Sequence, residues 1–158
     1  MKKLIALFLS MLLVLSFSGC GSSSSVETEP AEPVNLAELY EGFSATLPSM
    51  FLADADTMMN FMGICTEDCT QAVVALCADG LRTDEVWLLE AKSEDALTKL
   101  KQLAENRIQA KADETVSYSP DQYKVVEKAE LLVHDLYLAL LISPDVDALK
   151  AEFEAAIQ

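Results

Sequence analysis

Apolar residues recur at three- and four-residue intervals in several parts of the chain, and this spacing predicts about five helices. The longest predicted helix begins after the capping residue Ser93 and runs to about residue 112. Its lysines, Lys111 among them, fall largely outside the apolar stripe and are expected to face solvent. The other helices are expected at residues 35–46, at residues 56–62, after Ser119-Pro120 and after Ser143-Pro144-Asp145.

Four shorter apolar runs predict strands, at residues 71–78, 84–91, 130–133 and 136–142. Asp79-Gly80 is a turn signal between the first two runs, and His134-Asp135 is the hinge between the last two. The first two runs do not alternate cleanly, so both faces of the sheet are expected to be covered at least in part. The pattern predicts an α+β fold over residues 35–158, with an antiparallel sheet of three to four strands and about five helices.

The beginning of the chain has a different pattern, typical of a secretory signal peptide. Lys2 and Lys3 precede an apolar run over residues 4–15, and the small residues Ser18 and Gly19 follow it. A membrane-spanning helix needs about 20 apolar residues, so this run is short for that role. Residues 1–19 are therefore predicted to be a cleaved leader.

Cys20 follows directly after those small residues. The segment Leu-Ser-Phe-Ser-Gly-Cys at residues 15–20 resembles the lipobox of bacterial lipoproteins, although Phe17 stands where leucine is more usual. That resemblance implies that Cys20 is diacylated and becomes the new N-terminus. The Ser-, Pro- and Glu-rich residues 20–34 are then predicted to be a flexible tether. The alternative is a plain secreted protein, or an uncleaved anchor, in which Cys20 occurs by chance.

The charge of the chain limits its partners. The formal net charge is −15, and the predicted leader carries two lysines and no acidic residue. Such an acidic chain repels phosphate backbones and anionic headgroups, so nucleic-acid binding and electrostatic adsorption to membranes are not expected. Attachment to the lipid bilayer would come from acylated Cys20, since two acyl chains hold a protein stably.

Sulfur-containing residues raise the question of metal or redox chemistry. Met58, Met62 and Cys65 share one face at helical spacing, and soft sulfur ligands of this kind can hold copper(I). Methionine more often fills gaps in a core, and the core interpretation is favoured here. There are three further cysteines, Cys65, Cys69 and Cys77, so one thiol stays free if two of them form a disulfide. No obligatory disulfide is expected.

No set of residues in the sequence matches a known catalytic arrangement. His134 is the only histidine. It is interpreted as a residue at a strand end or turn, in preference to a member of a catalytic triad. Glu67-Asp68 is one acidic pair among 26 acidic residues and is expected to be solvated. Tyr118 and Tyr123 can stack on sugars, whereas Trp87 is expected in the core. No cofactor, metal site or catalytic residue is predicted.

Several blocks of the sequence occur in a characteristic order, namely Asp84-Glu85-Val86, the long helix with Arg107, residues 118–123 and the closing blocks 125–129 and 131–143. In these blocks the chain resembles a family of uncharacterised lipoproteins of Gram-positive bacteria that share a domain of unknown function. Asp135 departs from it, because glycine is expected before the last strand. The resemblance implies a fold and a location but no activity.

Together these observations predict a lipid-anchored protein on the extracytoplasmic face of the cell membrane. Its expected role is that of a non-enzymatic binding or accessory module for an unknown envelope protein or ligand. Two alternatives remain, which are a small envelope hydrolase that uses carboxylates and a protein that handles thiols or copper.

Overall fold

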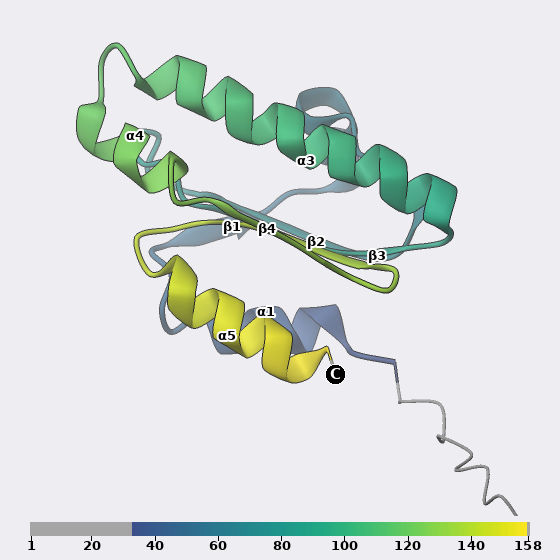
Figure 1. The fold of residues 1–158 in the computed structure, drawn as a ribbon. Coiled ribbons are helices and arrows are strands. Elements are labelled where there is room, and N and C mark those ends of the chain that lie inside the picture. Colours follow the sequence, from purple (N-terminus) through teal and green to yellow (C-terminus); the bar gives the residue numbers. More distant parts are fainter. Residues whose placement is uncertain (1–32, 158) are drawn as a thin grey trace, which may run out of the picture. The chain divides into compact units, whose positions relative to one another are not determined.

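Residues 33–157, as described by a computed structural model, form an open antiparallel sheet with helices on both faces (Figure 1). The sheet has five strands in the order β1-β2-β3-β5-β4, namely β1 Met50–Leu52, β2 Cys69–Cys77, β3 Glu85–Ala91, β4 Glu130–His134 and β5 Tyr137–Ile142. The same residues contain five α-helices, namely α1 Leu36–Phe43, α2 Ala55–Thr57, α3 Glu94–Thr115, α4 Pro120–Val126 and α5 Val146–Ala156. The predicted α+β class and the number of helices are confirmed.

The helices cover the sheet in two layers, with α3 and α4 on one face and α1 and α5 on the other (Figure 1). The central strand β3 serves both layers. Its Trp87 and Leu89 join the cluster beneath α3, whereas Val86 and Leu88 join the cluster of α1 and α5. All four side chains are fully buried. The unbroken apolar run of this strand is therefore explained by burial on both faces, as predicted.

The sheet has one strand more than the three to four predicted, and the additional strand is β1. It pairs with β2 in antiparallel register, with Phe51 opposite Leu76. Phe51 and Leu52 are 48% and 60% exposed, so β1 shows no alternation of buried and exposed positions. Three residues at a sheet edge are too short for a hydrophobic period to be recognised, which is why the sequence pattern did not predict this strand.

The predicted helix at residues 56–62 consists of two elements. Asp54 caps α2 by accepting a 2.8 Å hydrogen bond from the Thr57 amide. Hydrogen bonding from the Thr57 side chain and then from this amide lowers the pKa of Asp54. A π-helix, η1 Met58–Met62, follows directly, and a 3₁₀ helix, η2 Thr66–Asp68, precedes β2. Gly63 ends η1 with a φ of 75°, a left-handed conformation that glycine adopts without steric cost.

Asp135 takes the place of the expected glycine between β4 and β5 and adopts the same kind of backbone conformation. Its φ is 49°, and it is the only non-glycine residue with positive φ among residues 33–157. Two-residue hairpin turns require positive φ to match the twist of the strands. Aspartate tolerates the left-handed region better than most residues, which accounts for its presence at this turn.

Gln71 joins the start of the domain to the sheet. Its amide nitrogen donates to the Val34 carbonyl at 2.8 Å and to the Glu90 carboxylate at 2.7 Å. Its amide oxygen accepts from the Leu36 backbone N–H at 3.1 Å, and the Val34 N–H donates to the Tyr137 hydroxyl at 3.3 Å. We call this arrangement the Gln71 clamp.

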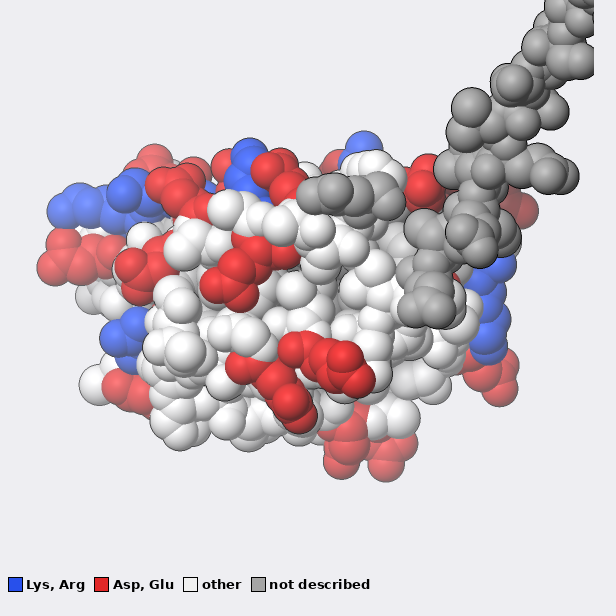
Figure 2. All heavy atoms as spheres, turned by 90° about the horizontal axis from the view of Figure 1, so that it is seen from below, with Lys and Arg blue, Asp and Glu red and all other residues white. Residues whose placement is uncertain are grey.

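The face covered by α1 and α5 is acidic. Figure 2 shows acidic side chains spread over this face, with Lys and Arg mainly near its edges. The pattern agrees with the net charge of −15. Among the described residues of this face, Figure 2 shows no broad patch of Lys and Arg that could bind a phosphate backbone.

Candidate functional site

A buried carboxylate at the start of β3 is the centre of the most connected polar group in the domain. The Glu85 side chain is fully buried, although it belongs to an otherwise apolar strand. Its Oε1 accepts hydrogen bonds from Trp87 Nε1 at 2.7 Å and from Arg107 Nε at 2.9 Å. Its Oε2 accepts from Arg107 Nη2 at 2.8 Å and lies 2.9 Å from Lys111 Nζ. Every oxygen of this carboxylate is therefore paired with two donors.

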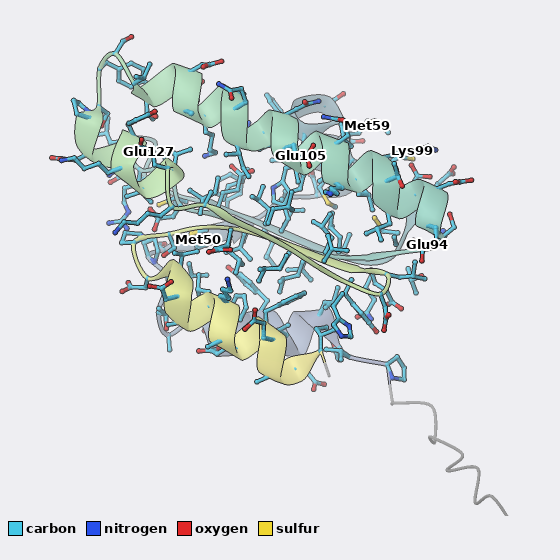
Figure 3. The ribbon with its side chains drawn as sticks, viewed as in Figure 1. Met50, Met59, Glu94, Lys99, Glu105 and Glu127 are labelled. Atoms are coloured by element: carbon cyan, nitrogen blue, oxygen red, sulfur yellow. The ribbon has the colours of Figure 1, made fainter. Side chains whose placement is uncertain are left out.

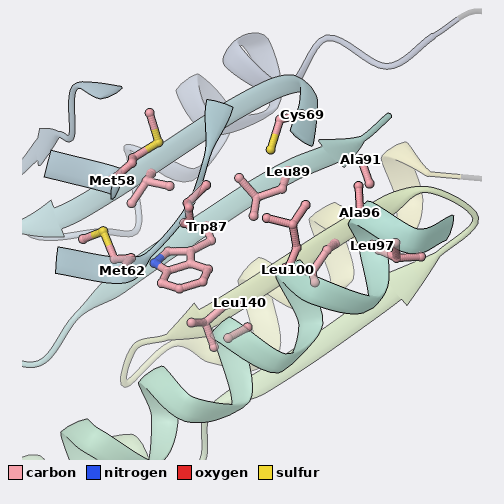
Figure 4. Packing of buried hydrophobic residues seen from close by; sticks show 14 of the residues in the cluster. Met58, Met62, Cys69, Trp87, Leu89, Ala91, Ala96, Leu97, Leu100 and Leu140 are labelled. Atoms are coloured by element: carbon pink, nitrogen blue, oxygen red, sulfur yellow. The ribbon is translucent and has the colours of Figure 1, made fainter. Parts of the chain in front are cut away.

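These donors determine the ionisation of the site. Burial by itself would raise the pKa of Glu85, but the hydrogen bond from Arg107 and the charges of Lys111 and Arg107 outweigh it. The net result is a pKa below the ordinary value of 4.5. Burial by itself would lower the pKa of Arg107, but the hydrogen bond and the charge of Glu85 outweigh it. The net pKa of Arg107 is raised, so both members of the pair remain ionised. The bond to Glu85 also gives the buried indole N–H of Trp87 an acceptor. Figure 4 shows Trp87 in the core among Met58, Met62 and Leu140.

The network continues from Glu85 into the loop between β2 and β3. Lys111 Nζ donates to the Thr83 carbonyl at 3.2 Å. The Gln122 side-chain oxygen, on α4, accepts from the Thr83 N–H at 2.9 Å and from its hydroxyl at 3.0 Å. Arg82 forms two hydrogen bonds with buried Asp84, at 2.9 and 3.0 Å. The loop is thus held against both α3 and α4.

A cavity of about 400 Å³ opens above this loop, between the end of α3 and the start of α4. We call it the Thr83 pocket. Its lining is polar and apolar in nearly equal parts, and consists of Gly80, Leu81, Arg82, Thr83, Lys111, Glu114, Thr115, Tyr118, Ser119 and Gln122. The residues that carried the family resemblance therefore converge in space, since the blocks 84–86, 107 and 118–123 meet at and below this pocket. The sequence showed the blocks but not that they meet.

The burial of Lys111 differs from the prediction made from the sequence. It was expected to face solvent on the outside of the long helix, but its side chain is only 11% exposed. Glu85 draws the ammonium group inward, and Lys111 lies one turn beyond Arg107 on the same face of α3. The available signal was an acidic pair, Asp84-Glu85, at the start of a buried strand, because buried charges require partners.

Three sulfur-containing residues, Met58, Met62 and Cys69, lie in the core. Met58 and Met62 are buried against Trp87 in the cluster beneath α3, which confirms the core interpretation for them (Figure 4). Cys65, Cys69 and Cys77 are free thiols in the structure. Cys69 is buried, and burial raises its pKa to about 11. Within residues 33–157, no three His, Cys, Asp or Glu side chains are grouped so as to hold a metal ion.

The remaining candidates lie apart from one another. His134 ends β4, as expected, and its Nδ1 lies 3.5 Å from Asp135 Oδ2. Both are more than half exposed. Glu67 and Asp68 lie in η2, where Asp68 is 3.8 Å from Lys99.

The predicted lipidation site cannot be located in this way. Cys20, with the leader 1–19 and most of the tether 20–34, lies outside the described residues. Among residues 33–157, no helix is both long and apolar enough to cross a bilayer.

Comparison with known proteins assigns the chain to a family. Residues 44–143, well over half of the sequence, match the model of a domain of unknown function, DUF4358. No curated protein and no solved structure gave a significant match. The matched region begins just after α1 and ends just after β5, so it contains the whole sheet and the Thr83 pocket. This chain therefore belongs to the DUF4358 family.

Proposed function

We propose that this protein is a lipid-anchored module on the extracytoplasmic face of the cell membrane, which binds a ligand in the Thr83 pocket without transforming it. The anchor is acylated Cys20, and residues 20–34 link it to the domain. Support for the anchor comes from the basic, apolar and small segments that precede Cys20. Support for a binding role comes from the pocket.

The observation that carries the binding role is the saturation of the carboxylates beneath the pocket. Hydrolysis by a carboxyl pair requires one group with a raised pKa that can give up a proton. The pKa of Glu85 is lowered instead, and both of its oxygens are occupied by donors. The Asp84 carboxylate accepts one hydrogen bond from Arg82 Nε and one from Arg82 Nη2. Groups fixed in this way shape a binding site and are poorly suited to proton transfer.

The same reasoning weakens the alternative that the protein handles copper or thiols. Met58 and Met62 are needed to fill the core around Trp87, and Cys69 is buried beside them. A copper-transfer site must expose its ligands to a partner. The pocket, by contrast, is open to solvent and lined by polar groups.

The anchor is tested on the full chain expressed in a Gram-positive host. We expect mass spectrometry to find a mature N-terminus at Cys20 that carries a diacylglyceryl group. We also expect the substitution Cys20→Ser to release the protein from the membrane fraction. Cys77→Ser, which replaces a cysteine inside the domain, is the matched control and leaves the protein in the membrane. An unacylated N-terminus, or Cys20→Ser protein that stays membrane-bound, contradicts the anchor.

The binding role is tested with the same purified chain in detergent micelles, by saturation-transfer NMR with uncharged sugars, short peptides and small carboxylates. At least one of these classes should receive saturation that is reduced by the pocket variant Tyr118→Ala. If no class does so while the protein remains folded, the proposed binding role is wrong.

A further inference from the structure

The charges around the Thr83 pocket balance. Arg82 is paired with Asp84, and Arg107 and Lys111 share Glu85. Glu114 lines the same pocket and adds one further carboxylate. The three positive and three negative groups cancel, so the pocket offers no net positive charge to an anion. The net charge of −15 on the whole chain disfavours an anionic ligand further.

The pocket nevertheless offers both hydrogen-bond donors and hydrogen-bond acceptors. The Gln122 side-chain oxygen is used by Thr83, whereas its amide nitrogen donates no hydrogen bond among the described residues. Lys111 retains one N–H beyond those directed at Glu85 and Thr83. Ser119 contributes a hydroxyl and Glu114 contributes acceptor oxygens, whereas the hydroxyl of buried Thr115 donates to the Lys111 carbonyl at 2.8 Å. A hydroxyl group both donates and accepts, so a ligand rich in hydroxyls matches this mixed lining.

The rim of the pocket is apolar. Tyr118 is 70% exposed and Leu81 is 85% exposed, and both line the cavity. An exposed aromatic ring with a polar tip suits a ligand that has one apolar face and a polar edge. Saccharide rings have this character, with C–H groups on the ring faces and hydroxyls around the edge. The volume of about 400 Å³ lies within the range of small-molecule sites.

We propose that the Thr83 pocket binds an uncharged saccharide, with a sugar ring against Tyr118 and its hydroxyls on Gln122, Lys111 and Glu114. This inference rests on the proposed binding function and names the class of its ligand.

The test uses the full chain in detergent micelles and an uncharged probe, triacetylchitotriose, with maltotriose as a second sugar. Saturation-transfer NMR measures binding, and titration gives Kd. Tyr118→Ala should weaken binding of the preferred sugar by about threefold to tenfold. Phe61→Ala is the matched control, because Phe61 is an equally exposed aromatic residue (73%) that does not line this pocket. It should leave Kd within about twofold. Circular dichroism confirms that both variants are folded.

Glu114→Gln separates an uncharged ligand from an anion. An uncharged sugar should lose affinity, since the amide accepts a hydrogen bond from a sugar hydroxyl more weakly than the carboxylate does. An anionic probe such as citrate should gain affinity when the carboxylate is removed. The saccharide inference is overturned if neither sugar binds at millimolar concentration, or if Tyr118→Ala leaves sugar binding unchanged. A third outcome is that citrate binds, that Tyr118→Ala reduces this binding, and that neither sugar binds. This result overturns the ligand class and leaves the proposed binding function intact.

Discussion

Glu85 and Arg107 lie 22 residues apart in the sequence and meet in a two-pronged ion pair that joins β3 to α3. The pair is shielded from water, since Glu85 is fully buried and the Arg107 side chain is 24% exposed. A charged group in such a position is stable only with its partner. The position of α3 over the sheet therefore depends on this contact as well as on apolar packing.

Glu85→Gln should destabilise the domain strongly. The amide cannot neutralise Arg107 and Lys111, so two buried cations lose their counterion. We expect the free energy of unfolding to fall by about 3–5 kcal/mol, measured by urea denaturation at pH 7.

Glu105→Gln is the matched control for that substitution. Glu105 lies on the exposed surface of the same helix, 3.9 Å from Lys101 (Figure 3). Exposed pairs contribute little, so this variant should lose less than about 1 kcal/mol. Equal losses in the two variants would mean that burial of Glu85 has no energetic importance.

The stability that Glu85 provides should depend on pH. The pKa of Glu85 in the folded protein lies below 4.5, so the folded state favours the ionised form. That stabilisation is complete above the unfolded pKa of about 4.3 and is lost as pH falls through the lower folded pKa. The difference in unfolding free energy between the native protein and Glu85→Gln should thus be constant from pH 7 to 5 and shrink below about pH 4. A difference that grows toward low pH would have the wrong sign.

Gly63→Ala should destabilise the end of the π-helix η1. Gly63 has a φ of 75°, and an added Cβ would lie 3.1 Å from Leu103 Cδ2 on α3. Left-handed backbone costs an alanine about 1–2 kcal/mol, and the close contact adds to it. Gly80→Ala provides the comparison, because a Cβ there has no neighbour within 4 Å. Thermal unfolding should show a loss for Gly63→Ala and a change within about 0.5 kcal/mol for Gly80→Ala.

Cys69 should resist alkylation in the folded protein. Burial raises its pKa to about 11, whereas Cys65 and Cys77 are partly exposed. The thiolate is the reactive form, so at pH 8 Cys69 should react at least about a hundredfold more slowly than a free thiol. Iodoacetamide labelling followed by peptide mass spectrometry measures each site, and labelling in urea shows that Cys69 reacts once exposed. Native-state labelling of Cys69 as fast as Cys77 would contradict its burial.

Regular elements with a clear period were predictable from the sequence. The long helix α3 has a helical apolar period, while β3 and the hairpin β4–β5 are short apolar runs bounded by turn residues. The edge strand β1 was not predictable, since its three residues gain their conformation only by pairing with β2. The π-helix η1 was expected as ordinary helix, because its apolar positions fit both forms.

The site was less predictable than the fold, because its residues come from three separate segments, at 80–87, 107–115 and 118–122. Lys111 has the sequence context of a surface lysine, and only the position of α3 over Glu85 makes it a buried partner. Gln122 and Thr83 have no sequence signal that relates them, yet two hydrogen bonds join them. Asp135 stands where glycine was expected, and its φ of 49° is a left-handed conformation that glycine adopts more readily.

The Gln71 clamp has a mechanical consequence. Tension that reaches Val34 from the preceding chain is transmitted through the Gln71 amide to β2 and Glu90, and through the Tyr137 hydroxyl to β5. The load therefore spreads across three interior strands before the first turn of α1 has to bear it. A domain held at this point can be pulled from its N-terminal side while the distant Thr83 pocket keeps its shape.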